Sequence, residues 1–125
     1  MARLPEEVKS AMAAANDAFP FATCSKDQVP NLIYLTYLKV VDDETVLVAD
    51  NYLDKTLRNI QENPRACFAV RDKEKGSYQV KGSIERKTSG PLYEEVQKWV
   101  EAKHPRKAAV ILHVEEVYNG ATKIV

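Results

Sequence analysis

Several residue types that build common catalytic and metal-binding sites are scarce in this sequence. The 125 residues include two cysteines, two histidines and four glycines. Cys24 and Cys67 lie far apart in apolar runs, which is typical of buried reduced thiols and not of a disulfide framework or a CxxC metal site. His104 and His113 alone do not supply the ligands of a metal centre. Neither GxGxxG nor GxxxxGK[ST] occurs, so no dinucleotide fingerprint or P-loop is indicated.

The chain also lacks an excess of either charge and any long apolar segment. Lys+Arg and Asp+Glu both number 18, whereas a nucleic-acid-binding domain normally carries a basic excess. No segment is long enough to span a membrane, and the N-terminus, with Glu6 and Glu7, does not resemble a secretory signal. We therefore expect a cytoplasmic protein that binds neither nucleic acid nor membrane, with one domain over residues 1–125.

Hydrophobic patterns predict more strands than helices. Apolar spacing predicts helices over roughly 5–15, from about Leu53 to Asn63, and from Pro91 to about His104. The predicted strands are 21–24, 31–41, 45–50, 66–70, 78–85 and 108–114. Short turns between consecutive strands require antiparallel pairing. A mainly β fold follows: a small closed or half-closed barrel with flanking helices.

Two strands carry further information. The run NLIYLTYLKVV, residues 31–41, is apolar on both faces, so we expect both faces to be covered, as in a barrel wall or a subunit interface. Gly82 lies inside the strand 78–85, which predicts a β-bulge or a close approach of two backbones.

Lys55 lies at a helix start, where the helix dipole disfavours a cation. If Asn51 caps the helix, Asp54 is its third residue and forms a capping-box-like pair; if Asp54 caps it, Lys55 and Thr56 are its first two residues. An anion in front of this end would meet free backbone N–H groups, the threonine hydroxyl and the ammonium group, and phosphate is the natural candidate. The alternative is an exposed lysine whose charge Asp54 offsets.

The order of four segments resembles the small FMN-binding split-barrel proteins of the pyridoxamine-5′-phosphate oxidase-like superfamily. The segments are VPNLIYLTYLKVVDDETVLVAD, NYLDKTLRNIQENPRACFAV, SYQVKGSIE and AAVILHVEEVY. The best-matching pieces are KVVDD, the KT of DKTLRNIQENP, and YQVKGS. The resemblance implies a six-stranded antiparallel Greek-key split barrel that works as a homodimer, with two FMN molecules at the dimer interface.

The same resemblance implies which residues contact FMN. The residues expected along the isoalloxazine ring are Ile33, Tyr34, Leu35 and Thr36. Those expected beside the ring or the ribityl chain are Ala49, Asp50 and Asn51. Lys55 and Thr56 are expected to hold the 5′-phosphate, and Trp99 is either a lid over the site or an ordinary core residue.

An FMN-binding oxidoreductase or electron-transfer protein is the function that this resemblance implies. The flavin would supply the redox chemistry, and no side chain stands out as a general acid or base. The sequence identifies neither a redox partner nor a substrate. It also lacks the extra segments with which true pyridoxamine-phosphate oxidases bind their substrate phosphate.

Three alternatives stay open. Tyr34 occupies a place where many relatives carry a small residue or proline, and a crowded site would leave a cofactor-free dimer that acts as a binding or regulatory module. A deazaflavin F420 enzyme would call for more basic residues around the cavity mouth. A haem-binding relative would need an accessible histidine, and neither histidine is expected in the pocket.

Overall fold

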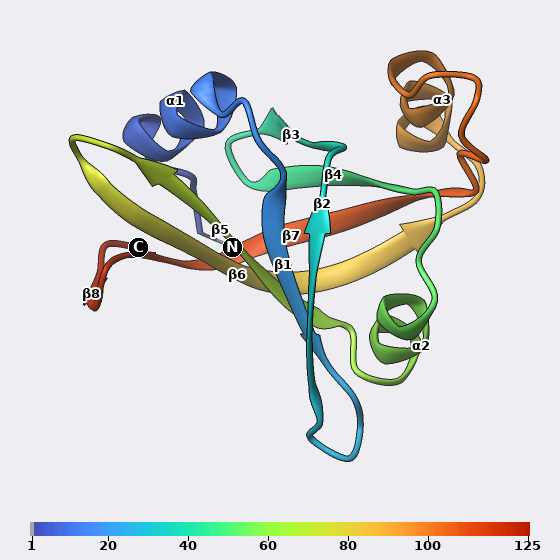
Figure 1. Cartoon of the computed structure of the whole chain (residues 1–125), viewed down its shortest axis with the longest axis horizontal. Helices are drawn as coiled ribbons and strands as arrows, with labels where there is room; N and C mark the ends of the chain where they lie inside the picture. The colour runs from blue at the N-terminus through green and yellow to red at the C-terminus, as the bar shows by residue number, and fades with distance from the viewer. Residues whose placement is uncertain (1) are drawn as a thin grey trace.

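The structure is a computed structural model that describes residues 2–125 (Figure 1). Its helices and strands are α1 (Glu6–Ala14), β1 (Phe19–Cys24), β2 (Pro30–Leu35), β3 (Leu38–Asp42), β4 (Thr45–Asp50), α2 (Lys55–Glu62), β5 (Arg65–Asp72), β6 (Gly76–Lys87), α3 (Pro91–Trp99), β7 (Ala108–Asn119) and β8 (Thr122–Lys123). None of the helices in this range is long and apolar enough to cross a membrane.

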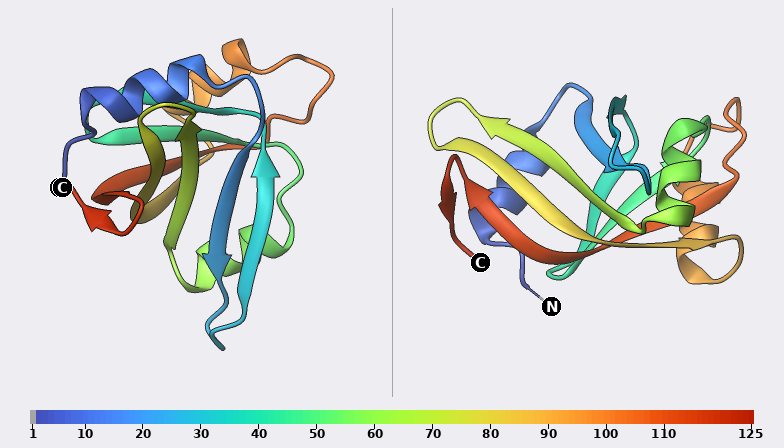
Figure 2. Two further views of the ribbon diagram at one scale, coloured as in Figure 1. Left: turned by 60° about the vertical axis from the view of Figure 1, so that its left-hand side comes forward. Right: turned by 90° about the horizontal axis from the view of Figure 1, so that it is seen from below.

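All the strands belong to one antiparallel sheet in the order β2-β1-β5-β6-β7-β4-β3, with β8 paired to β7. β2 and β3 lie at opposite ends of this order, yet only Thr36 and Tyr37 separate them in the sequence. The sheet must therefore curl until its two edges meet at this link, which makes an open half-barrel (Figure 2). The predicted mainly β split barrel with three flanking helices is confirmed.

The number of strands differs from the prediction of six because the run 31–41 is two strands and the tail adds β8. Nothing in the run marks the break, since neither glycine nor proline occurs at 36–37. The break is a consequence of the topology: β2 pairs with β1, whereas β3 pairs with β4.

Within the chain, only one face of β2 is covered, so cover of the other face by a second subunit stays a prediction. On β2, Ile33 is half-buried and Leu35 is buried, whereas Leu32 and Tyr34 on the other face are 67% and 74% exposed. The reason is that the described residues place no second layer over the outer face of β2.

The curled sheet encloses a core around Phe21, Phe68 and Tyr78, closed at one end by α1 through Val8. A second apolar cluster lies between α3 and the β4–β7 pair, where Val96 packs near Leu47. β4 buries residues on both faces because it lies between these two clusters.

Gly82 lies at a bulge in β6, as predicted. The register between β6 and β7 shifts between Lys81 and Gly82, and a Cβ at Gly82 would approach the His113 carbonyl oxygen to 2.2 Å. Glycine is therefore required here by a close backbone contact.

Candidate functional site

The first turn of α2 lacks the usual means of satisfying its backbone N–H groups. The helix begins at Lys55, with Asp54 in the N-cap position, but the Asp54 side chain makes no capping hydrogen bond. It accepts a hydrogen bond from Arg58 Nη1 at 3.0 Å instead. The first turn contains no acidic residue, and within residues 2–125 no carboxylate forms an ion pair with Lys55. The positive end of the helix dipole and the Lys55 cation therefore lie together, while the neighbouring Asp54 carboxylate pairs with Arg58.

A small cavity of about 310 Å³ lies at this end of α2. The residues lining it are Ser25, Val29, Pro30, Asn31, Lys55, Arg58 and Asn59. Two of these are cations and none is acidic. The β1–β2 hairpin supplies the opposite wall and extends beside α2 in Figure 1. This donor set suits an anion.

A buried polar network holds this helix end against the sheet. Asn31 Nδ2 donates to Thr56 Oγ1 at 3.0 Å and lies 3.3 Å from Thr23 Oγ1, and Asn59 Nδ2 donates to the same Thr23 oxygen at 3.0 Å. The Thr56 side chain is buried, so its hydroxyl faces the strands. The group of Thr56 best placed to meet an anion in front of the helix is its backbone N–H.

A larger cavity of about 570 Å³ lies further along β2. The residues lining it are Ile33, Tyr34, Leu35, Thr36, Tyr37, Ala49, Asn51, Tyr52, Leu53, Glu101, Lys103 and His104. It brings together six of the residues predicted from the sequence: Ile33, Tyr34, Leu35, Thr36, Ala49 and Asn51. Because a strand rises about 3.3 Å per residue, the small cavity at Asn31 lies only about 7 Å along β2 from the large one at Ile33.

Asp50 does not line either cavity. Successive residues of β4 point to opposite faces, so Ala49 reaches the large cavity and Asp50 turns away from it. Asp50 is fully buried; its Oδ2 accepts from Arg86 Nη2 at 2.9 Å and its Oδ1 accepts from the Leu53 N–H at 3.2 Å. These contacts link β4, β6 and the segment that leads into α2.

Trp99 also lies outside the large cavity. Its ring packs edge-on against Tyr37, with 5.4 Å between the centroids, and Lys39 Nζ lies 4.5 Å from the centre of its ring. It is half-buried at the border of the second apolar cluster, and its role as a lid stays a prediction.

His104 lies in the wall of the large cavity, so the expectation that neither histidine is in the pocket is wrong. Its Nδ1 lies 3.2 Å from the Tyr52 hydroxyl, and its ring is edge-on to Tyr37 at 5.7 Å. The loop that carries it is held to the end of β4, because Asn51 Oδ1 accepts from the Arg106 N–H at 3.1 Å. No sequence pattern indicates this position, because residue 104 follows α3 and reaches the link after β2 only through tertiary packing.

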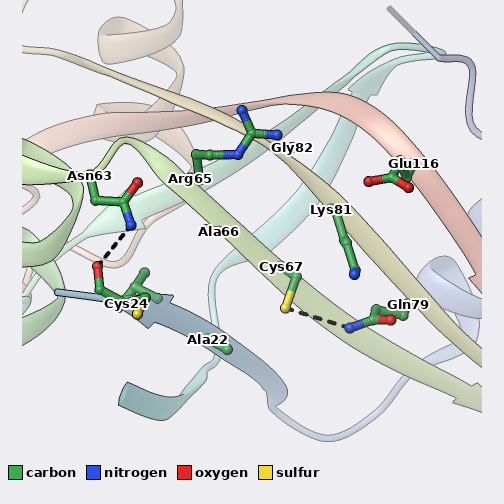
Figure 3. A pocket seen from close by; sticks show the side chains of 11 residues that line it. Ala22, Cys24, Asn63, Arg65, Ala66, Cys67, Gln79, Lys81, Gly82 and Glu116 are labelled. Carbon is green, nitrogen blue, oxygen red and sulfur yellow. Dashed lines mark hydrogen bonds between the residues drawn. The ribbon is translucent and has the colours of Figure 1, made fainter. Parts of the chain in front are cut away.

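The two thiols lie together on the outer face of the sheet. Figure 3 shows Cys24 and Cys67 at a shallow hollow of about 440 Å³, where Gln79 Nε2 lies 3.8 Å from Cys67 Sγ. Both are free but only half-buried, which corrects the expectation of buried thiols. The core-facing positions beside them are taken by Thr23 and Phe68, so alternation directs both sulfurs outward.

Residues 4–120 match the family model described as pyridoxamine 5′-phosphate oxidase, and the chain belongs to this family. An uncharacterized protein of Methanocaldococcus jannaschii is 37% identical over 122 residues, which cover 94% of this chain and 80% of that protein. HupZ of Group A Streptococcus has 27% identity and a TM-score of 0.84, with 98% of each chain covered.

Two more distant structures share the fold. One is an FMN-binding protein from Syntrophomonas wolfei, with 18% identity, a TM-score of 0.69 and coverage of 90% of this chain and 83% of that one. The other is an F420 reductase, with 17% identity, a TM-score of 0.70 and coverage of 92% and 98%.

Proposed function

We propose that this chain is an FMN-binding oxidoreductase or electron-transfer protein that works as a homodimer. The observation that carries the proposal is the uncapped start of α2, where Lys55 and Arg58 line a cavity without an acidic residue. The FMN-binding protein from Syntrophomonas wolfei, which has the same fold, supports this choice of ligand.

The 5′-phosphate of FMN fits the small cavity chemically. The first-turn N–H groups would donate to its oxygens, and the Lys55 ammonium would offset its charge. The Asn31–Thr56 hydrogen bond of 3.0 Å fixes the helix end that presents these donors, so little reordering is needed on binding.

The isoalloxazine ring fits the large cavity. The large cavity has a volume of about 570 Å³, which lies within the usual range for cofactor sites. Ile33, Leu35 and Ala49 form an apolar wall of this cavity. The bound flavin supplies redox chemistry, while the chain orients the ring and excludes water from it. Tyr34 is 74% exposed, so it borders the cavity without filling it, which argues against the crowded, cofactor-free alternative.

A second copy of the chain would cover the outer face of the β1–β2 hairpin. On this face of β2, Leu32 and Tyr34 are 67% and 74% exposed. Apolar side chains gathered on one surface mark an interaction site. Because Tyr34 also lines the large cavity, a partner placed on this face would close the flavin site.

Titration of the purified protein with FMN, followed by the visible flavin absorption, tests the proposal. Lys55→Ala should weaken FMN binding about tenfold to a hundredfold, because it removes a charge-assisted contact to phosphate. Lys73→Ala is the matched control, since Lys73 lies in the β5–β6 turn and lines neither of the two cavities. A wild-type protein that does not bind FMN, or equal affinities for all three proteins, would contradict the proposal.

A further inference from the structure

The side-chain amide of Asn51 has a fixed orientation in the wall of the large cavity. Asn51 directly follows β4, lines this cavity and is 9% exposed. Its Oδ1 accepts a hydrogen bond from the Arg106 N–H at 3.1 Å. Because a backbone N–H can only donate, the atom that faces Arg106 is the amide oxygen, and Nδ2 is the opposite end of the amide.

This Nδ2 is a hydrogen-bond donor without a partner in the chain. No hydrogen bond of Asn51 Nδ2 occurs within residues 2–125. It is not sealed inside the protein either, because the only buried side-chain nitrogen or oxygen without a partner in this range is Arg106 Nε. Since little of Asn51 is exposed and the residue lines the large cavity, the open side of Nδ2 faces that cavity.

The backbone that orients this amide is held in an unusual conformation. Arg106 has a φ of 49°, in the left-handed region that residues other than glycine rarely adopt. Gln97 on α3 holds it there: Gln97 Nε2 donates to the Arg106 carbonyl oxygen at 2.8 Å, and Arg106 Nη1 donates to the Gln97 carbonyl oxygen at 2.9 Å. Such conformations persist where the surroundings impose them, and they cluster at ligand sites.

We infer that Asn51 Nδ2 donates a hydrogen bond to N1 or the C2 carbonyl oxygen of the flavin ring, and that it thereby favours the reduced flavin. On reduction, N5 of the ring becomes a donor, whereas N1 and the C2 carbonyl oxygen remain acceptors. An amide N–H locked in one orientation suits only atoms that accept in both states. Arg106 and Gln97 are positioning residues, because they act through Asn51.

The preference for the reduced state follows from charge. Two electrons and one proton convert the flavin to an anion whose charge lies on N1 and the C2 carbonyl oxygen. A hydrogen bond to a charged acceptor is about twice as strong as one to a neutral acceptor, so the donor stabilises the reduced form more than the oxidised form. The inference rests on the proposed function, since the flavin ring must occupy the large cavity.

The midpoint potential of the FMN-loaded protein, measured by stepwise reduction with dithionite beside a reference dye, tests the inference. Asn51→Asp keeps the oxygen that accepts from Arg106 and replaces the donor with a second oxygen, whereas Asn51→Ala removes both groups. Asn51→Ala should lower the affinity for reduced FMN relative to oxidised FMN about tenfold, which lowers the two-electron potential by about 30 mV. Asn51→Asp should lower it further, because a carboxylate repels the anion.

Gln97→Ala should shift the potential in the same direction by a smaller amount, because it releases Arg106 and leaves the Asn51 amide in place. Asn16→Asp is the matched control: Asn16 is exposed and lines neither of the two cavities, so its variant should have the wild-type potential. A purely structural role of Asn51, or a hydrogen bond to the ribityl hydroxyls, would change the affinity for both oxidation states equally. The potential would then stay unchanged, and the inference would be overturned.

The two proposals fail in different ways. If the protein binds FMN but both Asn51 variants keep the wild-type potential, the inference about Asn51 is wrong and the flavin proposal stands. If the wild-type protein does not take up FMN, both are wrong.

Discussion

At the scale of single residues, buried amides and hydroxyls determine where the start of α2 lies. Asn59 is 8% exposed and Thr23 is 5% exposed, and the hydrogen bond of 3.0 Å between them ties the middle of α2 to β1. A buried polar group that loses its hydrogen-bond partner is still removed from water, so the free energy of its desolvation is no longer offset.

Asn59→Ala should therefore lower the free energy of unfolding by about 1–2 kcal/mol, because it removes a hydrogen bond to a buried hydroxyl. Urea unfolding measures the change, and Gln61→Ala, on the exposed side of the same helix, is the control. Equal stabilities of the two variants would show that the network does not hold α2.

Lys55 could be singled out from the sequence because a cation at a helix start interacts unfavourably with the helix dipole. This interaction depends only on the local sequence and not on tertiary packing. Asn31 and His104 could not be found in this way. Asn31 meets Thr56 only because the hairpin folds beside α2, and His104 meets Tyr52 across 52 residues of sequence. Asp50 was assigned to the wrong side of its strand for a related reason, since sequence position near the site does not reveal which face a residue occupies.

At the scale of helices and strands, a side-chain hydrogen bond joins α1 to β6. The Tyr78 hydroxyl donates to Glu7 Oε2 at 2.7 Å. This hydrogen bond to the carboxylate, together with burial, raises the pKa of Tyr78 to about 12 from its ordinary value of 10.0. The folded protein therefore holds the phenol proton more tightly than the unfolded chain does.

The stabilising effect of this contact should be fully present below pH 10 and should be lost as the pH rises through about 12, because the raised pKa favours the protonated phenol in the folded state. Urea unfolding between these pH values should show a steeper loss of stability for the wild type than for Tyr78→Phe. Tyr93→Phe, on α3, is the control and should follow the wild type. If the free energy of unfolding falls equally with pH in the wild type and in Tyr78→Phe, the raised pKa of Tyr78 does not contribute to stability.

The predicted elements were mostly correct where hydrophobic periodicity and proline set the boundaries, as for α1 and for the end of α2 before Pro64. The break of the run 31–41 could not be predicted. It depends on which neighbours β2 and β3 find at opposite edges of the sheet, and that information lies in long-range pairing.

At the scale of the whole molecule, the exposed apolar face of β2 carries the proposed dimer. Stable dimers typically bury about 1,200–2,000 Å² in total, and a charge placed in such a surface is strongly unfavourable. Leu32→Glu should therefore give a folded monomer in sedimentation experiments, with weaker FMN binding because Tyr34 and its surroundings lose their cover.

Val41→Glu is the matched control, because Val41 is an exposed apolar residue on β3, at the other edge of the sheet. It should remain dimeric. A monomeric wild type, or a Leu32→Glu variant that remains dimeric, would show that this face is not the interface.

Binding of a flavin phosphate at the uncapped start of α2 is tested by comparing FMN with riboflavin, which lacks the phosphate. Wild-type protein should bind FMN about a hundredfold more tightly than riboflavin, and Lys55→Ala should reduce this ratio about tenfold or more. Equal affinities of the wild type for FMN and riboflavin, or a ratio that Lys55→Ala leaves unchanged, would show that this helix end does not bind the phosphate.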